Sequence, residues 1–182
     1  MQKLRIAGDR GARFSAILLS SSLKSLMFCS GTSPADPTVM NQWREEMKVR
    51  AHKFAVDVIR FVDTLPYRAN TSRLKDQLVG AACGVDGNWH AACRARTHKE
   101  FAARLGTVVE EADEAEEWLD VMHDTKMSES NELNRLRAES KELRAIFAKA
   151  SRTANENEGR DRTRREGRRR KERKERPESG EA

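Results

Sequence analysis

The sequence has few of the residues that interrupt helices or build sheets. It contains four prolines and ten glycines in 182 residues, and aromatic side chains make up only 5% of the chain. It has no alternating apolar runs bounded by turn residues, which would be typical of strands. Charged residues make up 35%. This composition predicts an all-α protein, and the length allows one ordinary domain with tails.

The chain also lacks the usual features of an exported or membrane-bound protein. Its cysteines number three, so a disulfide framework is not expected, and reduced thiols in the cytoplasm are predicted. The apolar run from Phe14 to Leu19 is much shorter than a membrane span and is soon followed by Lys24. We therefore predict no membrane contact and interpret residues 1–40 as a disordered extension from an over-called start. A functional signal peptide is the alternative.

The net charge of +6 is concentrated at the two ends of the chain. Residues 1–40 hold five basic and two acidic residues, and residues 151–182 hold twelve basic and eight acidic residues. Residues 41–150 hold eighteen basic and nineteen acidic residues, a net charge of −1. The expected folded part is therefore not broadly basic, and a surface for nucleic acid is expected outside it.

Apolar residues recur every three or four positions in four separate segments. The segments run from Met47 to Leu65, from Leu74 to Ala92, from Phe101 to Met122 and from Leu133 to Ala150. This spacing places each set on one side of an α-helix. Pro66 ends the first segment, because proline disfavours helix at the residue before it. Four such helices with short connections predict an antiparallel up-down four-helix bundle over residues 41–150.

A capping box marks the start of the third predicted helix. Thr97 and Glu100 have the required spacing, in which the threonine hydroxyl accepts from a backbone N–H and the glutamate reaches back toward the cap. His98 therefore belongs to the third helix and not to the second.

Residues 151–182 form a basic tail without any aliphatic side chain larger than alanine, so they cannot bury an apolar stripe. We interpret this tail as disordered or transiently helical. It has no aromatic residue for base stacking, so contact with RNA or DNA is expected to be sequence-tolerant and salt-dependent. The candidate contacts are Arg164, Arg165, Arg168, Arg169, Arg170, Lys171, Arg173 and Lys174. A purely solubilising tail is the alternative.

The second helical segment is apolar on nearly every side. Between Leu78 and Cys93 only three side chains are clearly polar, those of Asp86, Asn88 and His90. A helix of this kind is normally covered on more than one face, which predicts a second copy of the chain as its partner. The predicted oligomer seam consists of Gly80, Gly84, Gly87, Asn88, Trp89 and Ala91.

The glycines and Asn88 give this seam its expected properties. Each glycine inside a helix costs roughly 1 kcal/mol relative to alanine, and close approach of a neighbouring helix would offset that cost. A kinked and frayed helix is the alternative. Asn88 falls on the apolar stripe, where a buried amide needs a hydrogen-bond partner and can fix helix register. Replacing Asn88 with leucine is therefore expected to change the oligomeric state.

Reactive residue types gather in the same segment, where Cys83, Asp86, His90 and Cys93 share one side of the helix. The two cysteines are about 15 Å apart along a helix, whereas zinc ligands lie about 2.0–2.3 Å from one ion. One ion therefore cannot bind all four, and we predict neither a metal nor a cofactor. A thiol- or metal-dependent enzyme using His90 and Cys93 is the alternative. The acidic run at residues 110–117 is interpreted as a solvated helix face.

Several of these motifs together resemble a known family. They are Gln77-Leu78, the small residues before Val85 and Asn88, the junction from Arg94 to Phe101, and the acidic run that ends at Trp118-Leu119. Over residues 44–150 the chain resembles four-helix bundle proteins related to those encoded in intervening sequences of 23S ribosomal RNA. The resemblance implies a small bacterial protein without assigned enzymatic activity that forms homopentamers. One branch of the family serves diversity-generating retroelements, which implies contact with a reverse transcriptase and nucleic acid.

Together these observations predict a non-enzymatic, homo-oligomeric four-helix bundle that acts as a scaffold or accessory protein in the cytoplasm. The expected partners are further copies of the chain, a protein partner and RNA or DNA. The basic tail is the segment expected to contact the nucleic acid.

Overall fold

The computed structural model describes residues 37–68 and 71–175 of the chain. Within these ranges it contains four helices and no strand: α2 (Pro37–Thr64), α3 (Ser72–Cys93), α4 (His98–Asp124) and α5 (Asn131–Glu175). The chain divides into two units, residues 1–43 and residues 44–182. The described part of the first unit is the start of α2. The fold described below is that of the second unit.

The N-terminal boundary of the bundle differs slightly from the prediction. Most of the predicted disordered extension, residues 1–36, lies outside the described residues. Residues 37–40, which were expected to belong to that extension, are helical because α2 begins at Pro37. Proline is favoured at the first position of a helix, where its missing N–H would have no partner.

Local sequence signals end and start the helices where expected. α2 ends at Thr64, two residues before Pro66. At the start of α4 the Thr97 hydroxyl accepts a hydrogen bond from the backbone N–H of Glu100 at 3.0 Å. The Glu100 carboxylate in turn accepts from the backbone N–H of Arg96 at 3.1 Å. The predicted capping box is therefore confirmed, with the returning bond made one residue before the cap.

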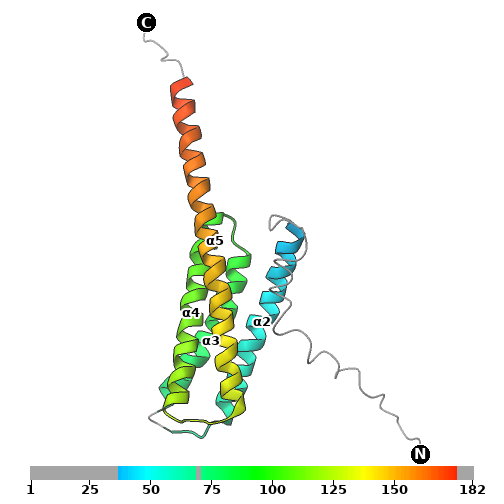
Figure 1. The fold of residues 1–182 in the computed structure, drawn as a ribbon, viewed down its shortest axis with the longest axis vertical. Coiled ribbons are helices and arrows are strands. Elements are labelled where there is room, and N and C mark those ends of the chain that lie inside the picture. The colour runs from blue at the N-terminus through cyan, green and yellow to red at the C-terminus, as the bar shows by residue number, and fades with distance from the viewer. Residues whose placement is uncertain (1–36, 69–70, 176–182) are drawn as a thin grey trace, which may run out of the picture. The chain divides into compact units, whose positions relative to one another are not determined.

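Contacts between helices show that neighbouring helices run antiparallel (Figure 1). As the residue numbers rise along one helix, the residue numbers of their partners on the next helix decrease. The pairs are Arg50–Glu139 (2.6 Å) and Asp57–Arg135 (2.7 Å) between α2 and α5, and Asp120–Arg137 (2.7 Å) and Glu116–Arg144 between α4 and α5. The all-α, antiparallel four-helix bundle predicted from the sequence is confirmed.

The core follows the predicted apolar stripes closely. Its largest fully buried side chains are Trp89, Phe147, Met47, Leu78, Leu105, Leu119, Met122, Leu133, Leu136, Leu143, Val58 and Val85. At the start of α3 the prediction was off by one position, because Leu74 is half-buried and Lys75 is buried instead. The Lys75 ammonium donates to the carbonyl oxygens of Leu65 and Pro66 at 3.0 and 2.9 Å. These bonds satisfy the buried charge and connect α3 to the end of α2.

Trp89 occupies the position in the core that the sequence assigned to its neighbour Asn88. Trp89 has 0% of its surface exposed, whereas Asn88 is half-buried. The Trp89 ring lies 5.2 Å from the ring of Phe147 on α5 and 6.4 Å from that of Phe101 on α4, between ring centres. An indole gains far more by burial than an amide does, so the helix turns its tryptophan inward.

The last helix is longer than predicted. The segment from residue 151 was expected to be disordered or transiently helical, yet α5 is one helix from Asn131 to Glu175. No proline interrupts this range, and extending a helix that is already nucleated in the bundle requires no new nucleus. Two ion pairs between residues four positions apart stabilise the last turns of this helix. They are Arg162–Glu166 at 3.0 Å and Arg168–Glu172 at 2.8 Å.

The position of Trp89 predicts a large effect of its removal. The Trp89→Ala variant should lose about 3–5 kcal/mol of unfolding free energy, because truncating a buried aromatic side chain leaves a cavity. Urea unfolding followed by circular dichroism measures this difference. The matched control is Tyr67→Ala, at a residue that is 81% exposed, which should change stability by less than about 0.5 kcal/mol. Equal stability of the two variants would contradict the assignment of Trp89 to the core.

Candidate nucleic-acid interface and assembly face

The basic part of α5 lies beyond the buried core. Phe147 is the last fully buried residue of α5, and every residue from Arg162 to Arg173 is exposed. Just before these residues, the Asp161 carboxylate lies 2.7 Å from Nδ1 of His98 at the start of α4. This ion pair connects α5 to the bundle at the point where burial ends. We call residues 160–173 the basic extension.

Most arginines of the basic extension have no acidic partner within the described part of the chain. Arg162 pairs with Glu166 and Arg168 pairs with Glu172. The arginines without an ion pair among the described residues are Arg160, Arg164, Arg165, Arg169, Arg170 and Arg173. The predicted contacts from Arg164 to Arg173 therefore all lie on one exposed helix. The side chain of the remaining predicted contact, Lys174, is not described. Arg168 alone among these arginines is engaged with a carboxylate.

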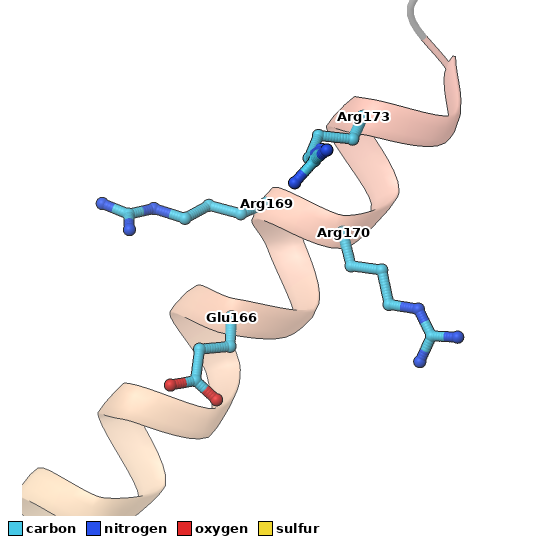
Figure 2. Close-up of a pocket in the computed structure, with 4 residues that line it drawn as sticks. All are labelled: Glu166, Arg169, Arg170 and Arg173. Carbon is cyan, nitrogen blue, oxygen red and sulfur yellow. The ribbon is translucent and has the colours of Figure 1, made fainter.

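The surface of the basic extension is open and does not enclose a ligand. A hollow of about 410 Å³ is lined by Glu166, Arg169, Arg170 and Arg173, all from α5. Figure 2 shows the guanidinium groups of Arg169 and Arg170 extending away from the helix in different directions. Because one helix supplies every lining residue, this hollow is a charged surface suited to a large polyanion and not a pocket for a small molecule.

The residues of the predicted oligomer seam on α3 differ in their exposure. Gly80 and Gly87 are exposed, and a methyl group added to either would meet nothing within 4 Å. Cys83 is exposed on the same side of α3, and Ala91 is half-buried. Trp89 does not belong to this surface because it fills the core of its own chain. We call Gly80, Cys83, Gly87 and Ala91 the α3 outer face.

Gly84 was predicted to contact a helix of another copy, but its close neighbour is Glu111 of the same chain. A methyl group at Gly84 would collide with the carboxylate of Glu111 on α4. The close approach that glycine permits here is therefore made by a side chain of the same bundle and not by the helix of another copy. Burial raises the pKa of the Glu111 carboxyl, and the neighbouring charges of Glu114 and Glu110 raise it further.

An Asp–His cluster connects α2 and α3 on the surface of the bundle. Oδ2 of Asp86 lies 2.9 Å from Nδ1 of His52, and Oδ1 lies 3.0 Å from Nδ1 of His90. The spacing of Asp86 and His90, four residues apart, is visible in the sequence. The part played by His52 was missed, because no local pattern shows which residue of α2 faces Asp86.

The residues proposed for the alternative enzyme are poorly placed for thiol or metal chemistry. Burial raises the pKa of the Cys93 thiol, although the nearby charges of Lys48 and Arg44 act in the opposite direction. A thiol held in its protonated form is a poor nucleophile and a poor metal ligand. Nδ1 of His90 is directed at Asp86. Within the described residues, no three His, Cys, Asp or Glu side chains converge in a way that would hold a metal ion.

The four helices of the described chain differ from membrane-spanning helices. None of them combines the length and the apolar character needed to cross a bilayer. This finding covers residues 37–68 and 71–175.

Four antiparallel helices around one apolar core define a four-helix bundle protein. Residues 45–149 match the family model described as 23S rRNA-intervening sequence protein. The chain therefore belongs to the family of 23S rRNA-intervening sequence proteins, and the resemblance noted in the sequence is confirmed.

A solved structure shows the same fold. It is the crystal structure of a protein with unknown function from the S23 ribosomal protein family of Bacteroides thetaiotaomicron. The two chains share 18% sequence identity with a TM-score of 0.55, and the match covers 60% of this chain and 97% of the other. A search of curated proteins found no match. The basic extension begins eleven residues after the end of the family match and lies outside the matched residues.

The raised pKa of Glu111 predicts how its replacement changes stability with pH. A carboxyl whose pKa is higher in the folded state favours folding when protonated, and this contribution is lost as the pH rises through the folded pKa. The Glu111→Gln variant should therefore be more stable than wild type at pH 7. The difference should disappear well below the ordinary carboxyl pKa of 4.5, where both states of the wild type are protonated.

Urea unfolding of both proteins at pH 7 and at low pH tests this expectation. Glu117→Gln is the matched control, because it removes the same charge from an exposed position on the same helix. A stability difference between Glu111→Gln and wild type that does not depend on pH would show that ionisation of Glu111 is not the cause.

Proposed function

We propose that this protein is a non-enzymatic, homo-oligomeric scaffold of the cytoplasm that contacts nucleic acid through the basic extension of α5. The observation that carries the proposal is the group of exposed arginines without ion pairs, Arg160, Arg164, Arg165, Arg169, Arg170 and Arg173. Cations that are not neutralised by the protein itself are free to replace the counterions of a phosphate backbone. The family description, which names 23S rRNA, is compatible with such a role.

The bundle itself offers a much weaker case for nucleic-acid contact. Its residues 41–150 carry a net charge of −1, and many of its basic side chains are paired with carboxylates. Arg50, for example, donates to both Glu139 and Glu142. Arg137 and Lys141 both approach Asp120. The contact with nucleic acid is therefore assigned to α5 beyond the bundle, while the bundle provides the base from which this helix projects.

Replacing three unpaired arginines tests the assignment. The variant Arg164→Gln/Arg165→Gln/Arg169→Gln should bind RNA and DNA oligonucleotides at least about tenfold more weakly than wild type at low salt. Its affinity should also fall less steeply with salt concentration, because each lost phosphate contact reduces the slope by nearly one. Fluorescence anisotropy across a series of salt concentrations measures both effects.

The matched control removes three positive charges from the bundle instead. Arg60, Arg68 and Arg73 are exposed, so the variant with all three changed to glutamine has the same net charge as the first variant. It should retain the affinity and the salt slope of wild type to within about twofold. An equal loss of affinity in the two variants would show that binding depends on net charge alone. If neither variant lost affinity, the basic extension would not be part of the interface.

The proposal of a homo-oligomer is supported by the α3 outer face. Gly80 and Gly87 present bare backbone to the surface, and Cys83 between them is also exposed. Glycine inside an exposed helix costs roughly 1 kcal/mol relative to alanine, so two such residues call for a compensating contact. Packing of a second copy against this face would provide one, because small residues allow helices to approach closely. The resemblance noted above leads us to expect a pentamer.

Enlarging one glycine of this face tests the oligomer. The Gly87→Gln variant should fold at least as stably as wild type, because the new side chain meets open space and glutamine is the better helix former. It should nevertheless sediment as smaller species at micromolar concentration. Gly106→Gln, at a glycine of α4 that also faces open space, should keep the wild-type sedimentation. A monomeric wild-type protein would contradict the proposed assembly.

A further inference from the structure

We propose that the basic extension binds duplex DNA by lying, as an intact helix, in the major groove and contacting its phosphates. This inference rests on the proposed function and narrows it to one class of nucleic acid. It follows from two properties of the helix: nothing in the described chain covers its outer turns, and its unpaired cations are spread around its axis.

The first property is access from every direction. All residues from Arg162 to Arg173 are exposed, so for about 18 Å of its length the helix is free of the bundle. An α-helix with side chains is about 10–12 Å across. The major groove of B-form DNA is about 12 Å wide and admits such a helix. The major groove of A-form RNA is deep and narrow and does not.

The second property is the distribution of charge around the helix axis. At 3.6 residues per turn, Arg160 and Arg164 lie on one side of α5. Arg165, Arg169 and Arg173, each four residues apart, lie on nearly the opposite side, and Arg170 lies between the two sides. Figure 2 shows Arg169 and Arg170 projecting from the helix in different directions. A single basic face would suit a flat anionic surface, whereas cations on two sides suit a groove whose two walls both carry phosphates.

The acidic residues of the extension are placed so that they do not oppose this contact. Glu166 and Glu172 are held by Arg162 and Arg168 through ion pairs along the helix. Asp161 is held by His98 of the bundle. Each carboxylate thus has a partner within the protein, and the remaining basic residues dominate the charge that a bound polyanion would meet.

The side chains also indicate what is not recognised. Residues 160–173 contain no aromatic residue to stack on unpaired bases, and no Asn or Gln to contact adenine. Single strands are bound mainly by stacking on aromatic side chains, so this helix is poorly suited to them. Contacts to phosphates position a protein on a duplex without selecting its sequence. The expected ligand is therefore double-stranded DNA, bound chiefly through its phosphates.

Gly167 allows the helix to be tested separately from its charge. It lies in the middle of the extension, and a methyl group there would meet open space. Gly167→Ala strengthens the helix, whereas Gly167→Pro breaks it, and both variants keep every charged residue. The full-length wild-type protein and the two variants would be titrated against a 20-base-pair DNA duplex, an RNA duplex of the same sequence and single-stranded DNA.

We expect wild type to bind the DNA duplex about tenfold more tightly than the RNA duplex, since only the former admits the helix. Gly167→Ala should keep or increase this preference. Gly167→Pro should bind the DNA duplex about tenfold more weakly and lose the preference. Circular dichroism and urea unfolding of each variant would establish that the bundle is intact.

The outcomes separate this inference from the proposed function. If wild type and Gly167→Pro bind all three ligands equally, the basic extension acts as a flexible polycation, and the groove model is wrong while the proposed function stands. A preference for the RNA duplex or for the single strand would also overturn the groove model. If no nucleic acid is bound at low salt, the proposed function fails together with it.

Discussion

The burial of Trp89 is the constraint on which the arrangement of the four helices depends. Its ring contacts Phe101 of α4 and Phe147 of α5, and its Nε1 donates to the carbonyl of Arg44 on α2 at 3.4 Å. The Arg44 guanidinium lies 5.3 Å from the centre of the Phe101 ring, where a cation–π interaction is favourable. One side chain of α3 thus contacts each of the other three helices.

The same constraint determines which side of α3 faces outward. With Trp89, Val85 and Leu78 buried, the opposite side of the helix carries Gly80 and Gly87. The glycines are therefore on the surface because the tryptophan is in the core, and Asn88 is displaced toward the boundary between the two. A helix that is apolar nearly all round in sequence is in this way divided into a core side and an outer side, and its three polar side chains, Asp86, Asn88 and His90, are half-buried between them.

Sequence patterns predicted most of the fold because the bundle is built from local signals. The apolar stripes, the proline after α2 and the capping box at Thr97 each act within a few residues. Most were found where expected, with Leu74 and Asn88 of the α3 stripe as exceptions. Two features could not be predicted in this way. The choice between Asn88 and Trp89 depends on the space left by Phe101 and Phe147. The contact of His52 with Asp86 depends on the register of two helices, which tertiary packing sets.

The sequence predicted which residues make up the candidate site, but not that they lie on a continuous helix. The basic residues were visible in the sequence. Their helical arrangement has a different origin, because buried residues such as Leu143 and Phe147 nucleate α5 in the bundle and the helix continues past them. A helix that is continuous with the core has a fixed rotation about its axis. Packing of Phe147 and the ion pair of Asp161 with His98 therefore determine the directions in which the arginines project. A disordered tail of the same composition would carry the same charge without that geometry. In the proposed contact with nucleic acid, the role of the bundle is therefore to orient a helix whose outer turns it does not touch.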